Sequence, residues 1–105
     1  MIAMNNELFH SALAGTKPVL VEFWAPWCSY CRRIAPALKK IDEEYADTLT
    51  VAQVNIDDVP ELAQAEGIEL IPTMIIYRGG KAVDSIVAPD SKAKIDAFIR
   101  SALEK

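Results

Sequence analysis

Cysteine, glycine and proline are scarce in this sequence, at 2, 4 and 6 of its 105 residues. Two cysteines cannot build the disulfide framework of a small secreted protein, and with the single histidine they cannot complete a four-ligand zinc site. The low glycine and proline content excludes a collagen-like or low-complexity chain. No apolar run reaches the roughly 18 residues that a membrane span requires. We therefore expect neither a metal site nor a membrane segment.

Basic residues are outnumbered by acidic ones. The chain has 11 lysines and arginines against 15 aspartates and glutamates, which leaves a net charge of −4. This balance argues against non-specific binding to nucleic acid or to an anionic membrane. The opening residues contain neither a basic stretch nor a long apolar one, so no signal peptide is visible and we expect a cytoplasmic protein.

Apolar residues, in contrast, are plentiful enough for a core. Hydrophobic residues make up 51% of the chain and charged residues 25%, a balance typical of globular proteins that excludes global disorder. A chain of 105 residues supports one compact domain rather than two. Since no linker or internal repeat divides the sequence, we expect residues 1–105 to form a single domain.

Apolar runs alternate with turn residues along the chain and predict an α/β fold. Strands are expected over residues 18–24, 50–56, 73–77 and 81–87, with a short edge strand over 1–4. Helices are expected over residues 6–14, with a cap at Asn5 or Asn6, and over about 29–46. A short helix capped by Asp57 or Asp58 and a last helix capped by Asp90 or Ser91 are also expected. Gly79-Gly80 suits a tight turn between the last two strands. This order predicts a mixed central sheet of four to five strands, flanked by helices on both faces.

The sequence Trp27-Cys28-Ser29-Tyr30-Cys31 lies between the first buried strand and the helix that follows it. Two intervening residues let one sulfur attack a foreign disulfide while the other stays within reach to resolve the mixed disulfide. Cys31 shares a helical stripe with Ile34 and Leu38, so we expect it to face the core. Cys28 stands at the helix start, where backbone amides and the helix dipole favour a thiolate. The pattern predicts an exposed nucleophile at Cys28 and a buried resolving thiol at Cys31. The alternative is a pair of inert apolar cysteines.

Four other side chains near this turn are candidates for a role at the site, and two of them, Glu22 and Tyr30, have alternative interpretations. Glu22 is the one charge in the strand 18–24, and burial of a carboxylate would raise its pKa; alternatively, it reaches water. We expect Trp24 to be structural and Trp27 to be exposed for docking. Tyr30 is either a docking aromatic or a solvated ring.

Together these motifs resemble the thioredoxin family. The resemblance covers nearly the whole chain and is carried by Val19-Leu20-Val21-Glu22-Phe23-Trp24-Ala25-Pro26-Trp27-Cys28, Cys31, Ile34-Ala35-Pro36, Val54-Asn55-Ile56-Asp57, Ile71-Pro72-Thr73 and the hairpin glycines. It implies the thioredoxin fold and a dithiol–disulfide oxidoreductase that acts on protein disulfides. It implies no bound organic cofactor, and electrons would arrive from a partner reductase. We expect a monomer.

The resemblance also assigns roles to residues that the pattern alone leaves open. It implies that Glu22 lies beneath Cys31 and takes the proton of its thiol. Taken by itself, Pro72 reads as an ordinary trans proline at a strand edge. The resemblance instead implies a cis Ile71–Pro72 bond beside the cysteines, with Ile71 offering backbone groups to an extended substrate. Pro36 falls inside the helix and is expected to kink it.

The chain departs from the usual thioredoxin pattern at several positions near the cysteines. Thioredoxins usually have Gly-Pro between the cysteines, a buried Asp, a Lys near that acid, and Gly at two positions of the docking face. This chain has in their places Ser29-Tyr30, Glu22, Gln53, Leu70 and Ala88.

The departures leave other functions open. Tyr30 before the second cysteine is similar to glutaredoxin, so glutathione-dependent reduction is one alternative. A second is a binding module in which two chains hold an iron–sulfur cluster through their thiolates. A third is a redox-inert partner subunit, against which the retention of both cysteines argues.

Overall fold

A computed structural model describes residues 1–105. Every element that the sequence predicts is present, with ends within two residues of the expected ones. In chain order, the elements are β1 (Ile2–Ala3), α1 (Asn6–Leu13), β2 (Val19–Trp24), α2 (Ser29–Glu44), β3 (Thr50–Asn55), α3 (Pro60–Ala65), β4 (Thr73–Arg78), β5 (Lys81–Val87) and α4 (Lys92–Leu103). None of the four helices combines the length and the apolar character needed to cross a membrane.

The five strands form one mixed sheet with the order β1-β3-β2-β4-β5. Strands β1, β3 and β2 run parallel, whereas β4 is antiparallel to β2 and β5 is antiparallel to β4. Strand β2 therefore lies in the centre of the sheet, which explains its nearly continuous apolar sequence. The two glycines between β4 and β5 both have a positive φ, at 62° for Gly79 and 80° for Gly80, as the tight turn requires.

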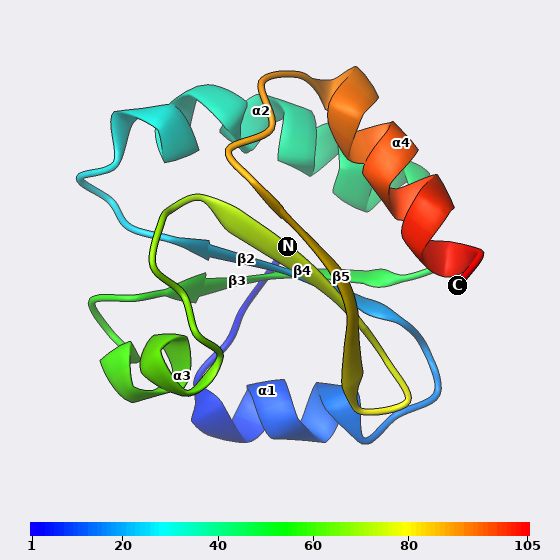
Figure 1. Cartoon of the computed structure of the whole chain (residues 1–105), viewed down its shortest axis with the longest axis horizontal. Helices are drawn as coiled ribbons and strands as arrows, with labels where there is room; N and C mark the ends of the chain where they lie inside the picture. Colours follow the sequence, from blue (N-terminus) through cyan, green and yellow to red (C-terminus); the bar gives the residue numbers. More distant parts are fainter.

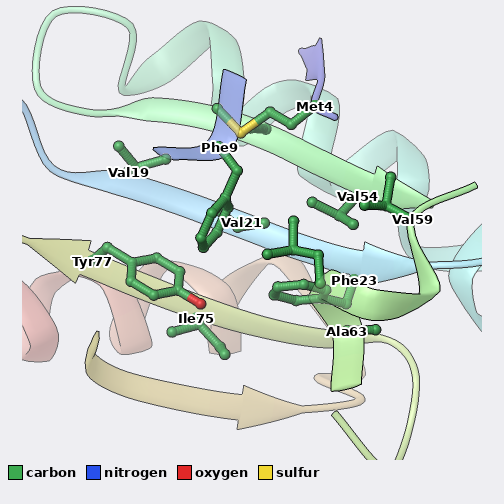
Figure 2. Close-up of a cluster of buried hydrophobic side chains, with 12 residues drawn as sticks. Met4, Phe9, Val19, Val21, Phe23, Val54, Val59, Ala63, Ile75 and Tyr77 are labelled. Carbon is green, nitrogen blue, oxygen red and sulfur yellow. The ribbon is translucent and has the colours of Figure 1, made fainter. Parts of the chain in front are cut away.

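Helices cover both faces of the sheet, as the sequence predicts. Figure 1 shows α2 and α4 on one side and α1 and α3 on the other. On the α1 and α3 side, Phe9, Val21 and Phe23 belong to one buried cluster, in which Phe9 meets the Tyr77 ring edge-to-face at 5.3 Å between centroids (Figure 2). On the α2 and α4 side, Leu20 belongs to a second cluster. Because successive residues of a strand point to opposite faces, β2 supplies side chains to both cores.

Helix α2 buries the stripe that its spacing predicts. Cys31, Ile34 and Leu38 face the core, and Pro36 is exposed on the opposite side. The helix continues through Pro36 as far as Glu44. A proline on the solvent side leaves the packed face of the helix intact.

Side-chain caps begin two of the four helices at predicted residues. Asn5 Oδ1 accepts the Leu8 N–H at the start of α1, and Ser91 Oγ accepts the Lys94 N–H at the start of α4. The predicted cap of α3 by Asp57 or Asp58 is wrong, because its N-cap is Val59, which provides no side-chain hydrogen bond.

Candidate active site

The two cysteines lie at the junction between β2 and α2. Cys28 is the N-cap of α2 with an extended backbone, and Cys31 lies in its first turn. They form a disulfide across a Cα–Cα distance of 5.3 Å. The Cys31 N–H also donates to Cys28 Sγ, at 3.1 Å. The first turn of α2 contains no acidic residue, so nothing there opposes negative charge on this sulfur.

Cys28 is less accessible than the sequence suggests. Cys31 is buried as expected, at 3% exposed, but Cys28 is only 7% exposed and not the open residue that was predicted. Trp24, Tyr30, Ile56 and Ile71 pack against the buried cluster that Cys28 and Cys31 form with Ala25. Cys28 thus belongs to a small buried cluster. Cys28 is still the more accessible of the two.

Trp27 precedes Cys28 and is 64% exposed, as predicted. Its ring is nevertheless held in one orientation, because Nε1 donates to the Asp57 carboxylate at 3.0 and 3.3 Å. Asp57 therefore binds the indole, and α3 begins after Val59. Nearby, Arg32 Nη1 donates to the Pro26 carbonyl at 2.7 Å and closes the turn that leads into Cys28.

Tyr30 lies between the cysteines and is half-buried against them. Its hydroxyl donates to the Ala88 carbonyl at 2.9 Å. The Arg33 guanidinium stands 5.2 Å from the centroid of the Tyr30 ring, within range of a cation–π contact. The solvated ring considered as an alternative for Tyr30 is therefore wrong.

The Ile71–Pro72 peptide bond is cis, as the resemblance implies. Ile71 packs against the cysteine pair, whereas Pro72 is buried. The Pro72 carbonyl accepts the Ala88 N–H at 2.8 Å. Leu70, just before this bond, is 64% exposed. The segment from Leu70 to Pro72, which is distant from the cysteines in the sequence, thus places apolar side chains beside the disulfide.

Glu22 is buried in the central strand at 1% exposed. It has the same orientation in β2 as Leu20, so it points into the layer between the sheet and α2, into which Cys31 also faces. Gln53 Nε2 donates to Glu22 Oε1 at 2.8 Å, and Oε2 has no partner. The alternative of an acid that reaches water is wrong.

The surroundings of Glu22 favour its neutral form. Burial raises the pKa of its carboxyl to about 7, and the hydrogen bond from Gln53 opposes this shift only in part. Gln53 carries no charge and so cannot stabilise the carboxylate as a lysine would. The prediction of a raised pKa is confirmed. Glu22 can therefore gain or lose a proton near neutral pH.

The remaining structural residues of the site lie on either side of the cysteines. Trp24 is half-buried, packs against the cysteine pair, and lines a pocket together with Gln53 and Asn55. Pro36 lies in the third turn of α2 and is exposed.

Asp57 and Ala88 take part in the site, but the sequence analysis did not predict their contacts: Asp57 was expected to cap a helix, and Ala88 was noted only as a replacement for the usual docking-face glycine. Asp57 could have been found, because β2 and β3 are parallel and the residues after their ends meet at one edge. Ile56 indeed donates its N–H to the Trp24 carbonyl at 2.9 Å. For Ala88 the signal was the glycine that the family usually has at this position, because glycine readily adopts a positive φ. Nothing in the sequence indicates that its carbonyl accepts a tyrosine hydroxyl.

Comparison with known proteins agrees with this geometry. The family model for thioredoxin matches residues 1–101. The chain is 42% identical over 103 residues to a thioredoxin of Alicyclobacillus acidocaldarius subsp. acidocaldarius, covering 98% of each chain. It is 46% identical over 91 residues to a thioredoxin of Acidithiobacillus ferridurans, covering 87% of this chain and 84% of the relative. It is also 44% identical over 87 residues to a bifunctional thioredoxin reductase/thioredoxin of Mycobacterium leprae, covering 83% of this chain and 19% of that protein.

The match extends over almost the full chain, and the mixed sheet with helices on both faces is the thioredoxin fold. The paired cysteines stand at disulfide distance in the Cys-x-x-Cys spacing. The chain therefore belongs to the thioredoxin family of thiol–disulfide oxidoreductases.

Proposed function

We propose that Cys28 is the nucleophile and Cys31 the resolving thiol in the reduction of protein disulfides. The Cys28 thiolate attacks one sulfur of the target, forms a mixed disulfide and releases the first target thiolate. Cys31 then loses its proton and attacks Cys28 Sγ, which forms the internal disulfide and releases the second thiolate. Two electrons pass from the dithiol to the target.

The order of attack rests on the position of Cys28 as the N-cap of α2. Its sulfur accepts the Cys31 N–H and stands at the positive end of the helix dipole. Cys31 lies deeper, in the stripe that faces the core. The less buried sulfur, with an amide donor, is the better first nucleophile.

Glu22 acts in this proposal as the base that receives the proton of Cys31. Its pKa of about 7 allows it to be charged or neutral under ordinary conditions. It points into the same layer as Cys31, and its second oxygen has no competing hydrogen bond. Gln53 holds the first oxygen and lines a pocket of about 340 Å³. This pocket offers the proton a route toward solvent.

The target protein would contact Trp27, Tyr30, Ile71 and Pro72. Trp27 presents an exposed ring beside Cys28, and Ile71 borders the pair from the opposite side. An extended target segment could pair with the backbone of Ile71 by strand addition.

A thioredoxin reductase is the proposed electron donor. The Mycobacterium leprae relative joins a reductase and a thioredoxin in one chain, which supports this choice. We further propose that residues 1–105 act as one domain, as a monomer, in the cytoplasm. The glutathione-dependent and iron–sulfur alternatives are not favoured, because the family model and the relatives that match over most of the chain are thioredoxins.

Single-cysteine variants test the assignment. Cys28→Ser should abolish insulin disulfide reduction with dithiothreitol as the electron source. Cys31→Ser should accumulate a covalent adduct with insulin that dithiothreitol releases, detected by non-reducing mass spectrometry. If Cys28→Ser forms the stable adduct and Cys31→Ser turns over, the order of attack is reversed.

A further inference from the structure

Tyr30 connects the active-site helix to a segment far away in the sequence. Its side chain packs against the buried cluster of Ala25, Cys28 and Cys31, and its hydroxyl donates to the Ala88 carbonyl at 2.9 Å, across 58 positions. The Arg33 guanidinium lies 5.2 Å from the centroid of the same ring. The ring, the hydroxyl and the neighbouring cation together hold this side chain in one place.

Ala88 has a backbone conformation that is unfavourable for alanine. Its φ of 48° makes it the one non-glycine residue with a positive φ in the chain. This region is easily adopted by glycine but carries a steric penalty for alanine, because of its Cβ atom. Both backbone groups of Ala88 are engaged: the carbonyl accepts from Tyr30, and the N–H donates to the Pro72 carbonyl at 2.8 Å.

These two hydrogen bonds, together with packing contacts, form a closed ring of contacts that includes the cysteine cluster. It runs from the cysteine pair through Tyr30 to Ala88, from Ala88 to Pro72, and back through Ile71 to the cysteines. Val87, just before Ala88, pairs with Thr73 of β4 and is 48% exposed. The Tyr30 hydroxyl thus supports the end of β5 beside the cis proline, where a target protein would dock.

We infer that Tyr30 is a positioning residue for docking. Its hydroxyl holds Ala88 in a conformation typical of glycine, so that the 87–88 segment and the Ile71–Pro72 segment present a surface of fixed shape to a protein disulfide. This inference rests on the proposed function, and it concerns how a target binds rather than how sulfurs exchange.

The Tyr30→Phe variant removes the hydroxyl and keeps the ring. The pre-reduced protein is mixed with excess insulin, and its oxidation is followed through the fluorescence of Trp24 and Trp27. We expect the half-saturating insulin concentration to rise about fivefold, the effect of losing one hydrogen bond. The limiting rate should fall less than twofold, since the hydroxyl does not touch sulfur.

The Ala88→Gly background tests whether Tyr30 acts through Ala88. Glycine adopts the positive φ without the steric penalty, so it needs the hydroxyl less. Adding Tyr30→Phe to Ala88→Gly should raise the half-saturating concentration less than twofold. A loss of equal size in both backgrounds would mean that the hydroxyl does not act through Ala88, and would overturn the inference.

Tyr45→Phe is the matched control, because it removes another half-buried tyrosine hydroxyl, which donates to Asp96 away from the cysteines. Its half-saturating concentration should equal that of the wild type. If Tyr30→Phe lowers only the free energy of unfolding and leaves half-saturation unchanged, its role is structural and the inference is wrong. If the wild-type protein fails to reduce insulin at all, the proposed function itself fails.

Discussion

Glu22 places a carboxyl group in a layer where its charged form is destabilised. Its pKa of about 7 in the folded protein exceeds the value of about 4.5 expected of an unfolded chain. Between these two pH values the folded state keeps a proton that the unfolded state has lost. The free energy of unfolding contributed by this group is therefore highest below pH 4.5 and falls as the pH rises to about 7.

Replacement of this acid by its neutral isostere should stabilise the protein at high pH. We expect Glu22→Gln to increase the free energy of unfolding by up to about 3 kcal/mol at pH 8, since each pKa unit corresponds to about 1.4 kcal/mol. The gain should vanish near pH 4.5. Urea unfolding of the oxidised protein at both pH values measures it. Glu43→Gln, on the exposed side of α2, is the control and should show no such pH dependence. Equal gains for Glu22→Gln at both pH values would contradict the buried acid.

The same replacement should slow catalysis at one step. Without a base to receive the Cys31 proton, resolution of the mixed disulfide should slow on the order of 100-fold, while its formation by Cys28 changes little. Rapid mixing followed by alkylation at intervals separates the two steps by mass. A variant that resolves at the wild-type rate would remove Glu22 from the mechanism.

Helix α2 determines the electronic environment of Cys28. Its first turn carries no acid, and Arg32 follows Cys31 directly. A Gly-Pro pair between the cysteines would lack one backbone donor, because proline has no N–H. Ser29-Tyr30 retains that donor, whereas the Tyr30 hydroxyl is engaged by the Ala88 carbonyl. The backbone donor, the absence of an acid and the nearby arginine favour the thiolate, and stabilising the reduced form makes the disulfide a better oxidant.

We therefore predict that the Cys28–Cys31 pair has a reduction potential above the general thioredoxin reference of about −270 mV. The expected value lies between that reference and the range of about −200 to −230 mV for glutaredoxins. Equilibration with glutathione redox buffers measures it. A potential at or below about −270 mV would contradict the prediction.

Two substitutions at residue 30 separate the causes. Tyr30→Pro, tolerated in the first helical turn, removes the N–H and should lower the potential by about 30 mV, equivalent to about 1.4 kcal/mol. Tyr30→Phe keeps the N–H and serves as its matched control. If both variants shift equally, the loss of the hydroxyl, which they share, determines the potential, and the amide does not.

Over the whole molecule, β2 ties the two cores together. Val21 and Phe23 pack under α1 and α3, and Leu20 packs under α2 and α4. We expect the oxidised protein to unfold in one transition, with an enthalpy of about 70 kcal/mol near 60 °C for a chain of this size. Calorimetry should give equal calorimetric and van't Hoff enthalpies. Two resolved transitions would argue against a single domain.

The sequence by itself determined the features that follow from local order along the chain. The stripe of Cys31, Ile34 and Leu38 reports which side of α2 is buried, because helical period depends only on spacing. The apolar run of β2 reports a strand covered on both faces. The Cys-x-x-Cys spacing between these two elements then indicates the redox chemistry. Each of these inferences needs only neighbours in the sequence.

The tertiary structure decided the contacts that join distant segments. Asp57 was predicted as a possible cap of α3, but its carboxylate accepts the Trp27 indole N–H, a contact that depends on the packing of two loops. Tyr30 finds its partner 58 positions away, at a residue whose positive φ no local pattern predicts. Cys28 was expected to be open, but side chains from three other parts of the chain cover it. Such contacts depend on which surfaces the fold brings together, and spacing along the chain does not carry that information.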